Sequence, residues 1–238
     1  MERTFQYRWL EQGRLIILLA FFTLGCMAVR AQDDPQYRLE IGAGVGVMTY
    51  EGDFNGNVLS DMQPAGFLVG RYNFDPYKDL KLSVGFGKIK GSSANVDTFY
   101  PDYAENSYSF NHTLVDMNLV FEYNFWPYGT GRDYRGAQRL VPYILGGLGA
   151  TYVKGNEKNV FTANVPLGIG AKYKVNERLN LGLAWTFHFS LSDELDGVKD
   201  PYWVKSSGIF KNSDCYSTIA VSVTYSFSAK CKTCNKEE

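Results

Sequence analysis

Residues 217–227 read STIAVSVTYSF and alternate apolar and small side chains with a period of two. Successive side chains of a β-strand point to opposite sides of the sheet. One face of this stretch therefore carries the large apolar side chains, which are Ile219, Val221, Val223, Tyr225 and Phe227. The other face carries only serine, threonine and alanine. Such a strand suits a sheet with lipid on one side and a polar interior on the other.

The same alternation recurs in seven earlier stretches, which are predicted as strands. They cover approximately residues 38–50, 64–74, 80–90, 107–125, 140–153, 161–173 and 179–190. Each is long enough to cross a bilayer as a tilted strand. The sequence therefore predicts an all-β fold, a small antiparallel up-and-down transmembrane β-barrel of eight strands over residues 32–228.

The faces opposite the apolar side chains are predicted to line the interior of this barrel. In the first stretch that face carries Gly42, Gly44 and Gly46, as expected where space inside a small barrel is scarce. In other stretches one face carries charged side chains. Because charges are costly in lipid, this face is predicted to point into the lumen. The predicted lumen charges are Arg71, Asp116, Glu122 and Lys172, which we expect to form structural ion pairs.

The first 31 residues have the three parts of a secretion signal. Arg3, Arg8 and Arg14 precede the apolar run at residues 15–25, and Val29-Arg30-Ala31 forms a small-residue cleavage site. The apolar run is shorter than the roughly 20 residues of a membrane-spanning helix. We expect cleavage after Ala31, and hence a protein of the cell outer membrane.

Charge and composition exclude some other classes. Beyond the signal, 20 Lys and Arg residues face 23 Asp and Glu residues, which does not favour nucleic acid as a partner. Two histidines, His112 and His188, are too few for a multi-histidine metal site, and no cofactor motif is present.

His188 and Ser190 share a face near one strand end, and an outer-membrane lipid hydrolase would need both to reach lipid. Because that face is predicted to line the lumen, we expect no catalytic residue.

The connections between strands alternate in length. The short turns at residues 75–79 and 175–178 contrast with the long segments 52–63, 91–106 and 191–214. Bacterial barrels place short turns in the periplasm, which predicts that both termini are periplasmic. Residues 127–139 then form an unusually long periplasmic connection, and the arginines Arg132, Arg135 and Arg139 make it a candidate docking turn.

Aromatic residues near the strand ends are expected to form interfacial girdles. One girdle comprises Phe74, Phe125, Trp126, Tyr173, Tyr225 and Phe227, and the other Tyr50, Tyr152 and Phe189. Lys88 and Lys90 interrupt this scheme, because they continue the apolar face of residues 80–90. They either meet lipid phosphates or are turned inward by a bulge.

Residues 229–238 are predicted to be a periplasmic tail that contains Cys231 and Cys234 in a CxxC motif. These cysteines can form a local disulfide, bond a partner's cysteine or bind metal together with outside ligands. Cys215 lies one membrane crossing away, far beyond the ~6 Å Cα separation of a disulfide. We expect Cys215 to be free or bonded to another molecule.

Several short motifs occur in an order and spacing that, taken together, suggest a known family. They are EIGAGVG at residues 40–46, YEGD at 50–53, RYNF at 71–74, VPY at 141–143, PLGIG at 166–170, DELDG at 193–197, DCYS at 214–217 and CKTC at 231–234. With them, residues 37–234 resemble the PorG-like outer-membrane barrels associated with type IX protein secretion.

The resemblance implies a non-enzymatic component that tethers periplasmic ring proteins of the secretion machinery to the outer membrane. Its partners would be those ring proteins and outer-membrane lipid. The alternative that the residues leave open is a surface-exposed small barrel that binds a ligand, lipid or host component through its long outer loops.

Overall fold

The computed structural model describes residues 37–51, 61–92, 109–130, 136–155, 159–192, 195 and 214–229. Eight strands account for most of them. They are β1 (Tyr37–Glu51), β2 (Gln63–Asp75), β3 (Lys78–Ser92), β4 (Ser109–Asn124), β5 (Leu140–Lys154), β6 (Asn159–Lys174), β7 (Leu179–Ser190) and β8 (Cys215–Ala229). The described ranges hold no helix that is long and apolar enough to cross a membrane.

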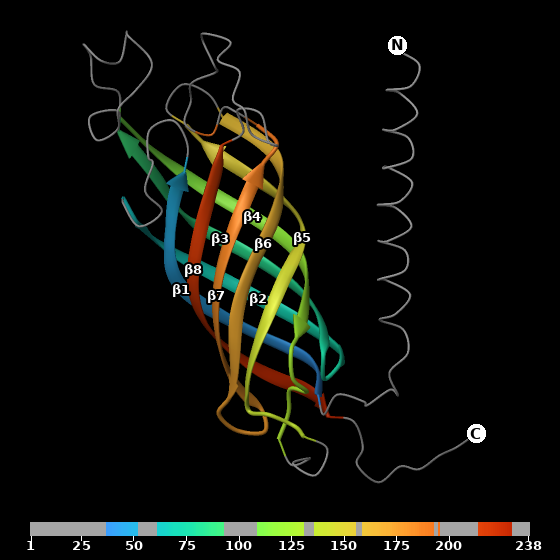
Figure 1. Cartoon of the computed structure of the whole chain (residues 1–238). Coiled ribbons are helices and arrows are strands. Elements are labelled where there is room, and N and C mark those ends of the chain that lie inside the picture. The colour runs from blue at the N-terminus through green and yellow to red at the C-terminus, as the bar shows by residue number, and fades with distance from the viewer. Residues whose placement is uncertain are drawn as a thin grey trace, which may run out of the picture. The chain divides into compact units, whose positions relative to one another are not determined.

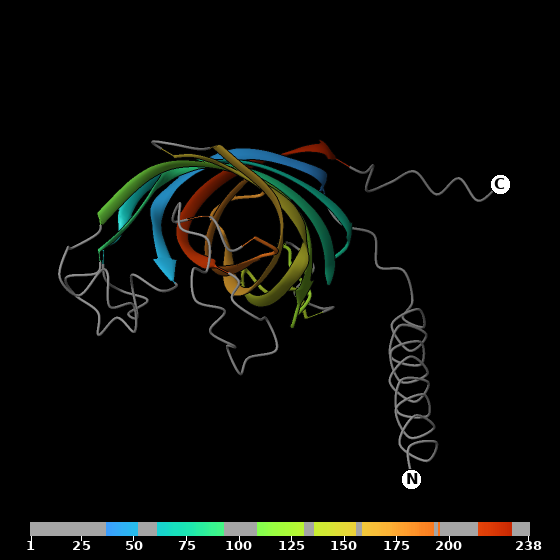
Figure 2. The same cartoon turned by 90° about the horizontal axis from the view of Figure 1, so that it is seen from above.

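The strands close into a single barrel in chain order, in which each strand pairs with the next and β8 pairs with β1 (Figures 1 and 2). The closing pair is antiparallel and runs in continuous register from Tyr37 opposite Ala229 to Glu51 opposite Cys215. This confirms the predicted eight-stranded up-and-down barrel. A barrel of this size has an interior that side chains can fill.

The outer surface of the barrel is apolar. Val45 and Leu148 are each 71% exposed and Phe161 is 76% exposed, although all three lie within strands. A water-soluble protein rarely exposes a continuous apolar surface of this kind. The period-two pattern thus places lipid-facing residues outside and the polar and charged residues of the strands inside.

The two ends of the barrel differ in their connections. The turn end holds the start of β1 and the end of β8, together with the tight β2–β3 and β6–β7 turns. In the first turn the Tyr77 amide donates to the Asp75 carboxylate over 2.7 Å, and in the second the Val175 amide donates to the Leu179 carbonyl over 2.9 Å. The loop end is the opposite end, where β1–β2, β3–β4, β5–β6 and β7–β8 are joined.

Glycines on the inner face of β1 allow the closing seam to curve tightly. A Cβ atom on Gly42 would lie 1.9 Å from the Val223 carbonyl oxygen, and one on Gly46 would lie 2.0 Å from that of Ile219. Both obstacles are backbone atoms of β8, which cannot move aside as a flexible side chain can. The glycine face of the sequence is therefore a requirement of barrel closure.

At the loop end, the Tyr50 side chain lies inside the barrel, whereas those of Lys88 and Lys90 lie outside it. Tyr50 was expected in the outer aromatic girdle, but this is wrong, because its side chain is fully buried in the lumen. It shares the inner face with Met48, as the period of two requires. Lys88 and Lys90 remain exposed on the outer face, since the β3–β4 register continues through them without a bulge.

Candidate functional site

The lumen has three successive regions. A charged cluster lies toward the turn end, a small cavity lies in the middle, and an apolar layer lies toward the loop end. The buried charges of the cluster are Glu40, Arg71, Asp79, Lys81, Glu122, Lys172 and Lys174. The apolar layer comprises Met48, Tyr50, Ala65, Ile89, Phe110, Leu114, Val153, Val160, Leu195 and Tyr216.

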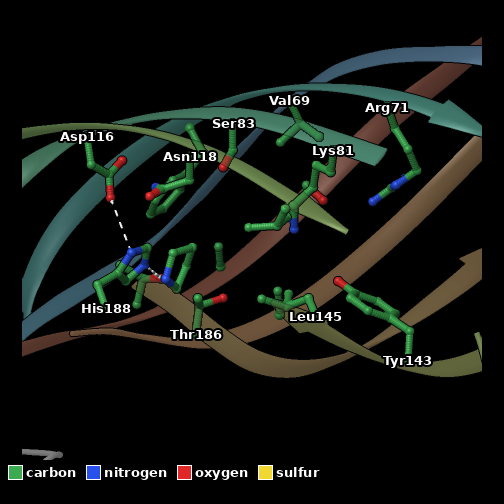
Figure 3. A pocket seen from close by; sticks show the side chains of 17 residues that line it. Val69, Arg71, Lys81, Ser83, Asp116, Asn118, Tyr143, Leu145, Thr186 and His188 are labelled. Carbon is green, nitrogen blue, oxygen red and sulfur yellow. Dashed lines mark hydrogen bonds and ion pairs between the residues drawn. The ribbon is translucent and has the colours of Figure 1, made fainter. Parts of the chain in front are cut away.

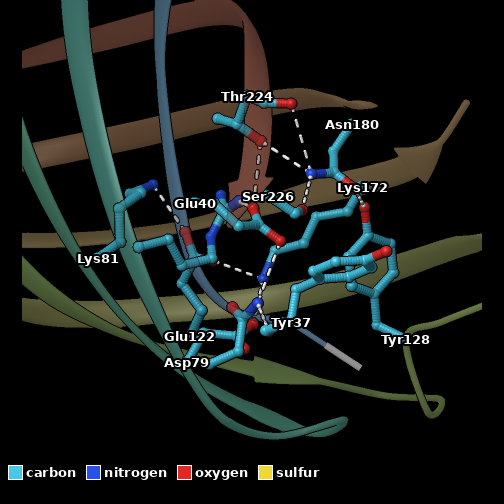
Figure 4. A network of polar contacts seen from close by, with 12 residues as sticks. Tyr37, Glu40, Asp79, Lys81, Glu122, Tyr128, Lys172, Asn180, Thr224 and Ser226 are labelled. Atoms are coloured by element: carbon cyan, nitrogen blue, oxygen red, sulfur yellow. Dashed lines mark hydrogen bonds and ion pairs between the residues drawn. The ribbon is translucent and has the colours of Figure 1, made fainter. Parts of the chain in front are cut away.

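Arg71 on β2 pairs with two carboxylates of the charged cluster, Glu40 and Glu122, which are labelled in Figure 4. One of its Nη atoms lies 2.6 Å from a carboxylate oxygen of Glu40, and its Nε lies 2.9 Å from a carboxylate oxygen of Glu122. The carboxylate of Glu122 also pairs with Lys81 at 2.8 Å. Arg71 thus joins strands β1, β2 and β4 across the lumen.

Lys172 on β6 extends this network to the other side of the barrel. Its ammonium group contacts the carboxylates of Asp79 and Glu122, the latter at 2.6 Å, and lies 4.6 Å from the ring centroid of Tyr143. The side-chain amide of Asn124 donates to Asp79 over 2.9 Å. Buried charges are tolerated only when they are paired and hydrogen-bonded in this way.

Arg71, Glu122 and Lys172, which the sequence pattern predicts as lumen charges, all lie in this cluster. Asp116, the fourth named charge, lies apart from them and accepts hydrogen bonds from the Tyr216 hydroxyl at 3.0 Å and the Gly85 amide at 2.9 Å. Three further charged residues of the lumen, Asp79, Lys81 and Lys174, were not predicted. Their positions alternate with outward apolar residues, so the same period-two rule identifies them.

The β4–β5 connection closes the turn end of the lumen. The Tyr128 amide donates to the Pro76 carbonyl over 2.9 Å, and its hydroxyl donates to the Asn180 side chain over 2.9 Å. Its ring lies 5.0 Å from the ammonium group of Lys174. Burial raises the pKa of the Tyr128 hydroxyl, so that it remains a neutral hydrogen-bond donor. This connection is therefore part of the barrel wall as well as a surface segment.

The cavity in the middle of the lumen has a volume of about 50 Å³ (Figure 3). Its lining is mixed, because polar side chains such as Asp116, Asn118 and His188 alternate with apolar ones such as Phe67 and Leu145. The Oδ1 atom of Asn118 and the Nδ1 atom of His188 are buried without a hydrogen-bond partner in the described part of the chain. A cavity of this size with unpartnered polar atoms in its wall suits a few ordered water molecules rather than an organic ligand.

His188 and Ser190 do not form an outward-facing catalytic pair. The His188 ring stacks on that of Tyr216 at a centroid distance of 4.4 Å, and its Nε2 lies 3.3 Å from the Thr218 hydroxyl. The Ser190 hydroxyl is fully buried and accepts from the Ser192 amide over 3.0 Å. Neither side chain reaches lipid, so the lipid hydrolase hypothesis does not fit this geometry.

Two described residues of the β7–β8 connection, Leu195 and Asp214, are buried at the loop end of the lumen. Leu195 is fully buried in the apolar layer, and its carbonyl lies 3.1 Å from Nδ1 of His112. Its amide donates to the Asp214 carboxylate over 2.8 Å, and the Tyr50 hydroxyl donates to the same carboxylate over 2.6 Å. Asp214 therefore links the connection to the barrel wall.

Replacing Asp214 by asparagine is expected to loosen the β7–β8 connection. The Tyr50 hydroxyl and the Leu195 amide donate to different oxygens of the Asp214 carboxylate. In asparagine one of these oxygens is replaced by an NH2 group, which cannot accept a hydrogen bond, so one of the two donors loses its acceptor. We expect faster cleavage of residues 196–213 by a protease added to the folded barrel, followed by gel electrophoresis. Asp61→Asn, at the same end, should leave the cleavage rate near that of the native chain. Equal rates for Asp214→Asn and the native chain would contradict the link.

Some predicted site residues lie outside the described residues, namely Cys231, Cys234, Arg132 and Arg135, as do the signal segment and the tail beyond Ala229. Arg139 is exposed at the turn end, and its carbonyl accepts from the Lys174 amide over 2.9 Å. Cys215 carries a free thiol at the loop end, 3.7 Å from a carboxylate oxygen of Glu51.

A closed barrel of eight strands, apolar outside and charged within, defines this chain as an outer-membrane β-barrel protein. Residues 15–236 match the model of a family described as "Domain of unknown function (DUF6089)", and the chain belongs to that family. No curated protein matches the sequence.

Solved structures of small barrels resemble the fold at low sequence identity. Neisserial surface protein A shares 12% identity, with 79% of this chain and 97% of that chain covered and a TM-score of 0.45. Ail of Yersinia pestis, in complex with sucrose octasulfate, shares 10%, with coverage of 81% and 100% and a TM-score of 0.48. OprG of Pseudomonas aeruginosa shares 12%, with coverage of 84% and 100% and a TM-score of 0.48.

Proposed function

We propose that this protein is a non-enzymatic outer-membrane component of the type IX protein secretion machinery, which tethers periplasmic ring proteins to the membrane. The resemblance of its motifs to PorG-like barrels suggests the system. The observation that carries the tethering role is the lumen, which is closed by Tyr128 at the turn end and by Leu195 at the loop end. In the described part of the chain this filling leaves a cavity of only about 50 Å³, which directs attention to the two ends of the barrel.

The turn end is the face that we assign to the periplasm. It holds both short turns, and bacterial barrels place short turns there. Tyr37 and Ala229, which are the two ends of the described barrel, lie at this face. The ten-residue tail, residues 229–238, therefore begins on the same side. The tail with Cys231 and Cys234 and the turn with Arg132, Arg135 and Arg139 would then share one docking face.

The β4–β5 connection supports this assignment. Its backbone is held by hydrogen bonds from the Gln138 amide to the Pro127 carbonyl, at 2.8 Å, and from the Phe125 amide to the Pro142 carbonyl, at 3.1 Å. The described residues of this connection are thus fixed to the barrel and present their exposed side chains in a defined geometry, which lowers the entropic cost of binding a partner. Arg139 is one such side chain.

The first test is co-purification from cells under non-reducing conditions. Because Ala229 still pairs with Tyr37, the tail must be removed from residue 230 onward to keep β8 complete. We expect the native chain to retain periplasmic secretion proteins, and the chain lacking residues 230–238 to insert normally but lose both these proteins and secretion. Cys231→Ser/Cys234→Ser shows whether the cysteines hold the partner, and Cys215→Ser, at the opposite end, is the matched control.

A tailless chain that inserts correctly, retains the same partners and supports normal secretion would refute the tail as tether. A native chain that purifies without periplasmic partners would favour the second candidate function, binding of a ligand, lipid or host component at the loop end. The fixed positions of Leu195 and Asp214 at the loop end favour that candidate, because they attach two points of the β7–β8 connection to the barrel. Replacing residues 197–212 by a short Gly-Ser linker would then abolish binding while the tail stays intact.

A further inference from the structure

Three lysines lie on the outer face of the barrel at the loop end, where the sheet would otherwise be apolar. They are Lys88 and Lys90 on β3 and Lys154 on β5, and all three side chains are exposed. Neither the closed lumen nor the proposed docking face uses them. Their positions on neighbouring strands can be compared through the register of β3, β4 and β5.

The register brings two of these lysines into one row across the sheet. Lys88 lies opposite Thr113 on β4, and Thr113 lies opposite Lys154 on β5. Lys154 in turn lies opposite Asn159 on β6. Residues directly opposite each other in a sheet share a face, and strands are about 4.8 Å apart, so the two lysines lie about 10 Å apart at their Cα atoms. Both ammonium groups can reach one phosphate group, with the Thr113 hydroxyl between them.

The next row toward the middle of the barrel is apolar and aromatic. It consists of Phe86, Val115, Tyr152 and Phe161 in the same register. Phe86 is 61% exposed and Phe161 is 76% exposed on the lipid side. The basic row is therefore only two residues, about 7 Å, beyond the apolar belt. Aromatic rings mark the boundary between hydrocarbon and headgroups, which places the lysines at the headgroups.

The charges of this row are only partly neutralised by the protein. Lys90 pairs with Asp61 at 3.2 Å. For Lys88 and Lys154, the described part of the chain provides no carboxylate within ion-pair distance. Two ammonium groups that have no carboxylate partner among the described residues and lie beside a lipid-facing belt are poorly placed for contact with a protein partner in water, but they are well placed for anionic lipid headgroups.

We propose that Lys88, Thr113 and Lys154, with Asn159 and Lys90 at their sides, form a binding site for the phosphate group of a membrane lipid. The lipid belongs to the leaflet that surrounds the loop end. Given the orientation assigned under the proposed function, this is the outer leaflet, and the ligand is a phosphorylated glycolipid. Its acyl chains would lie along the belt formed by Phe86, Tyr152 and Phe161.

The test uses the mature chain refolded in zwitterionic detergent micelles and titrated with diphosphoryl lipid A, with native mass spectrometry as the measurement of bound lipid. Each lysine near an anionic lipid surface contributes about a fivefold factor in affinity, so Lys88→Gln/Lys154→Gln is expected to weaken binding about thirtyfold. The matched control is Arg38→Gln/Lys78→Gln, which removes an exposed arginine and a half-buried lysine at the turn end. It should bind lipid A as the native chain does. Lys88→Arg/Lys154→Arg keeps both charges and should retain binding.

Equal binding of lipid A by the native chain and by Lys88→Gln/Lys154→Gln would overturn the proposal, provided that both run as folded barrels on unheated gels. Displacement of lipid A by millimolar inorganic phosphate would also overturn it, because the site would then recognise free phosphate and not a lipid. Neither result depends on secretion or on periplasmic partners. Failure of the lipid site and failure of the tethering role are therefore distinguishable.

Discussion

Replacing Arg71 by methionine is expected to destabilise the folded barrel by about 3–5 kcal/mol, the usual cost of breaking a buried ion pair by removing one partner. Methionine fills a similar volume but leaves Glu40 with neutral donors only. These donors are the Thr224 hydroxyl at 3.1 Å and the Asn73 amide at 3.1 Å. Glu122 loses one cation but keeps Lys81 and Lys172, so the cost arises mainly at Glu40.

Urea unfolding in phospholipid vesicles, followed by tryptophan fluorescence, measures this change. The double variant Arg71→Met/Glu40→Gln should recover a large part of the lost stability, because it removes the stranded charge together with its partner. Arg38→Met is the control, since Arg38 is exposed on the same strand as Glu40. If the free energy of unfolding of Arg71→Met lay within 1 kcal/mol of that of the native chain, as it does for a surface substitution, the charged cluster would not stabilise the barrel.

Replacing Gly42 by valine is expected to prevent barrel closure altogether. The Cβ atom would lie 1.9 Å from the Val223 carbonyl oxygen and 2.6 Å from the Thr224 Cα, and both are backbone atoms of β8. Relief of these contacts would require β1 and β8 to separate, which would leave the edges of both strands unpaired in lipid. No folded fraction should then accumulate.

Refolding into detergent micelles, with the mobility of unheated samples on denaturing gels as readout, tests this expectation. Gly70→Val on β2 is the matched control, because a Cβ atom at that outward-facing position has no neighbour within 4 Å. It should fold as the native chain does, although valine is bulkier than glycine at both sites. A normal yield of folded Gly42→Val would show that the seam tolerates more space than the structure indicates.

The architecture could be predicted from the sequence because a barrel depends on a simple alternation. Residues 217–227 and their seven counterparts gave the strand number, the lipid-facing side and the inward position of Arg71, Asp116, Glu122 and Lys172. The same rule, applied without exception, also places Tyr50 inside. The prediction that Tyr50 lies at the membrane interface was wrong. It rested on the general enrichment of aromatic residues at interfaces and not on the position of Tyr50 in its strand, where the period of two makes it face inward.

Which charges meet inside the barrel could not be predicted from the sequence. Arg71 and Glu122 are on different strands, and whether their side chains reach each other depends on the register and on the curvature of the sheet. Leu195 was unpredictable for another reason, since no periodic pattern marks a single residue of a connection that enters the lumen. Tyr128 is a similar case, because its contacts with Asn180 and Lys174 require the β4–β5 connection to fold back over the barrel.

The seam between β1 and β8 also determines when this fold becomes complete. The pairs that close it join residues 164 to 192 positions apart, from Glu51 and Cys215 to Tyr37 and Ala229, whereas the other seven strand pairs join sequence neighbours. Contacts of such high sequence separation form late, because the entropy of ordering the intervening chain must be lost first. During biogenesis β1 therefore keeps an open edge until the last strand has been delivered. A chain that stops before residue 215 has no closing strand, and it would be a substrate for periplasmic proteases and not a smaller barrel.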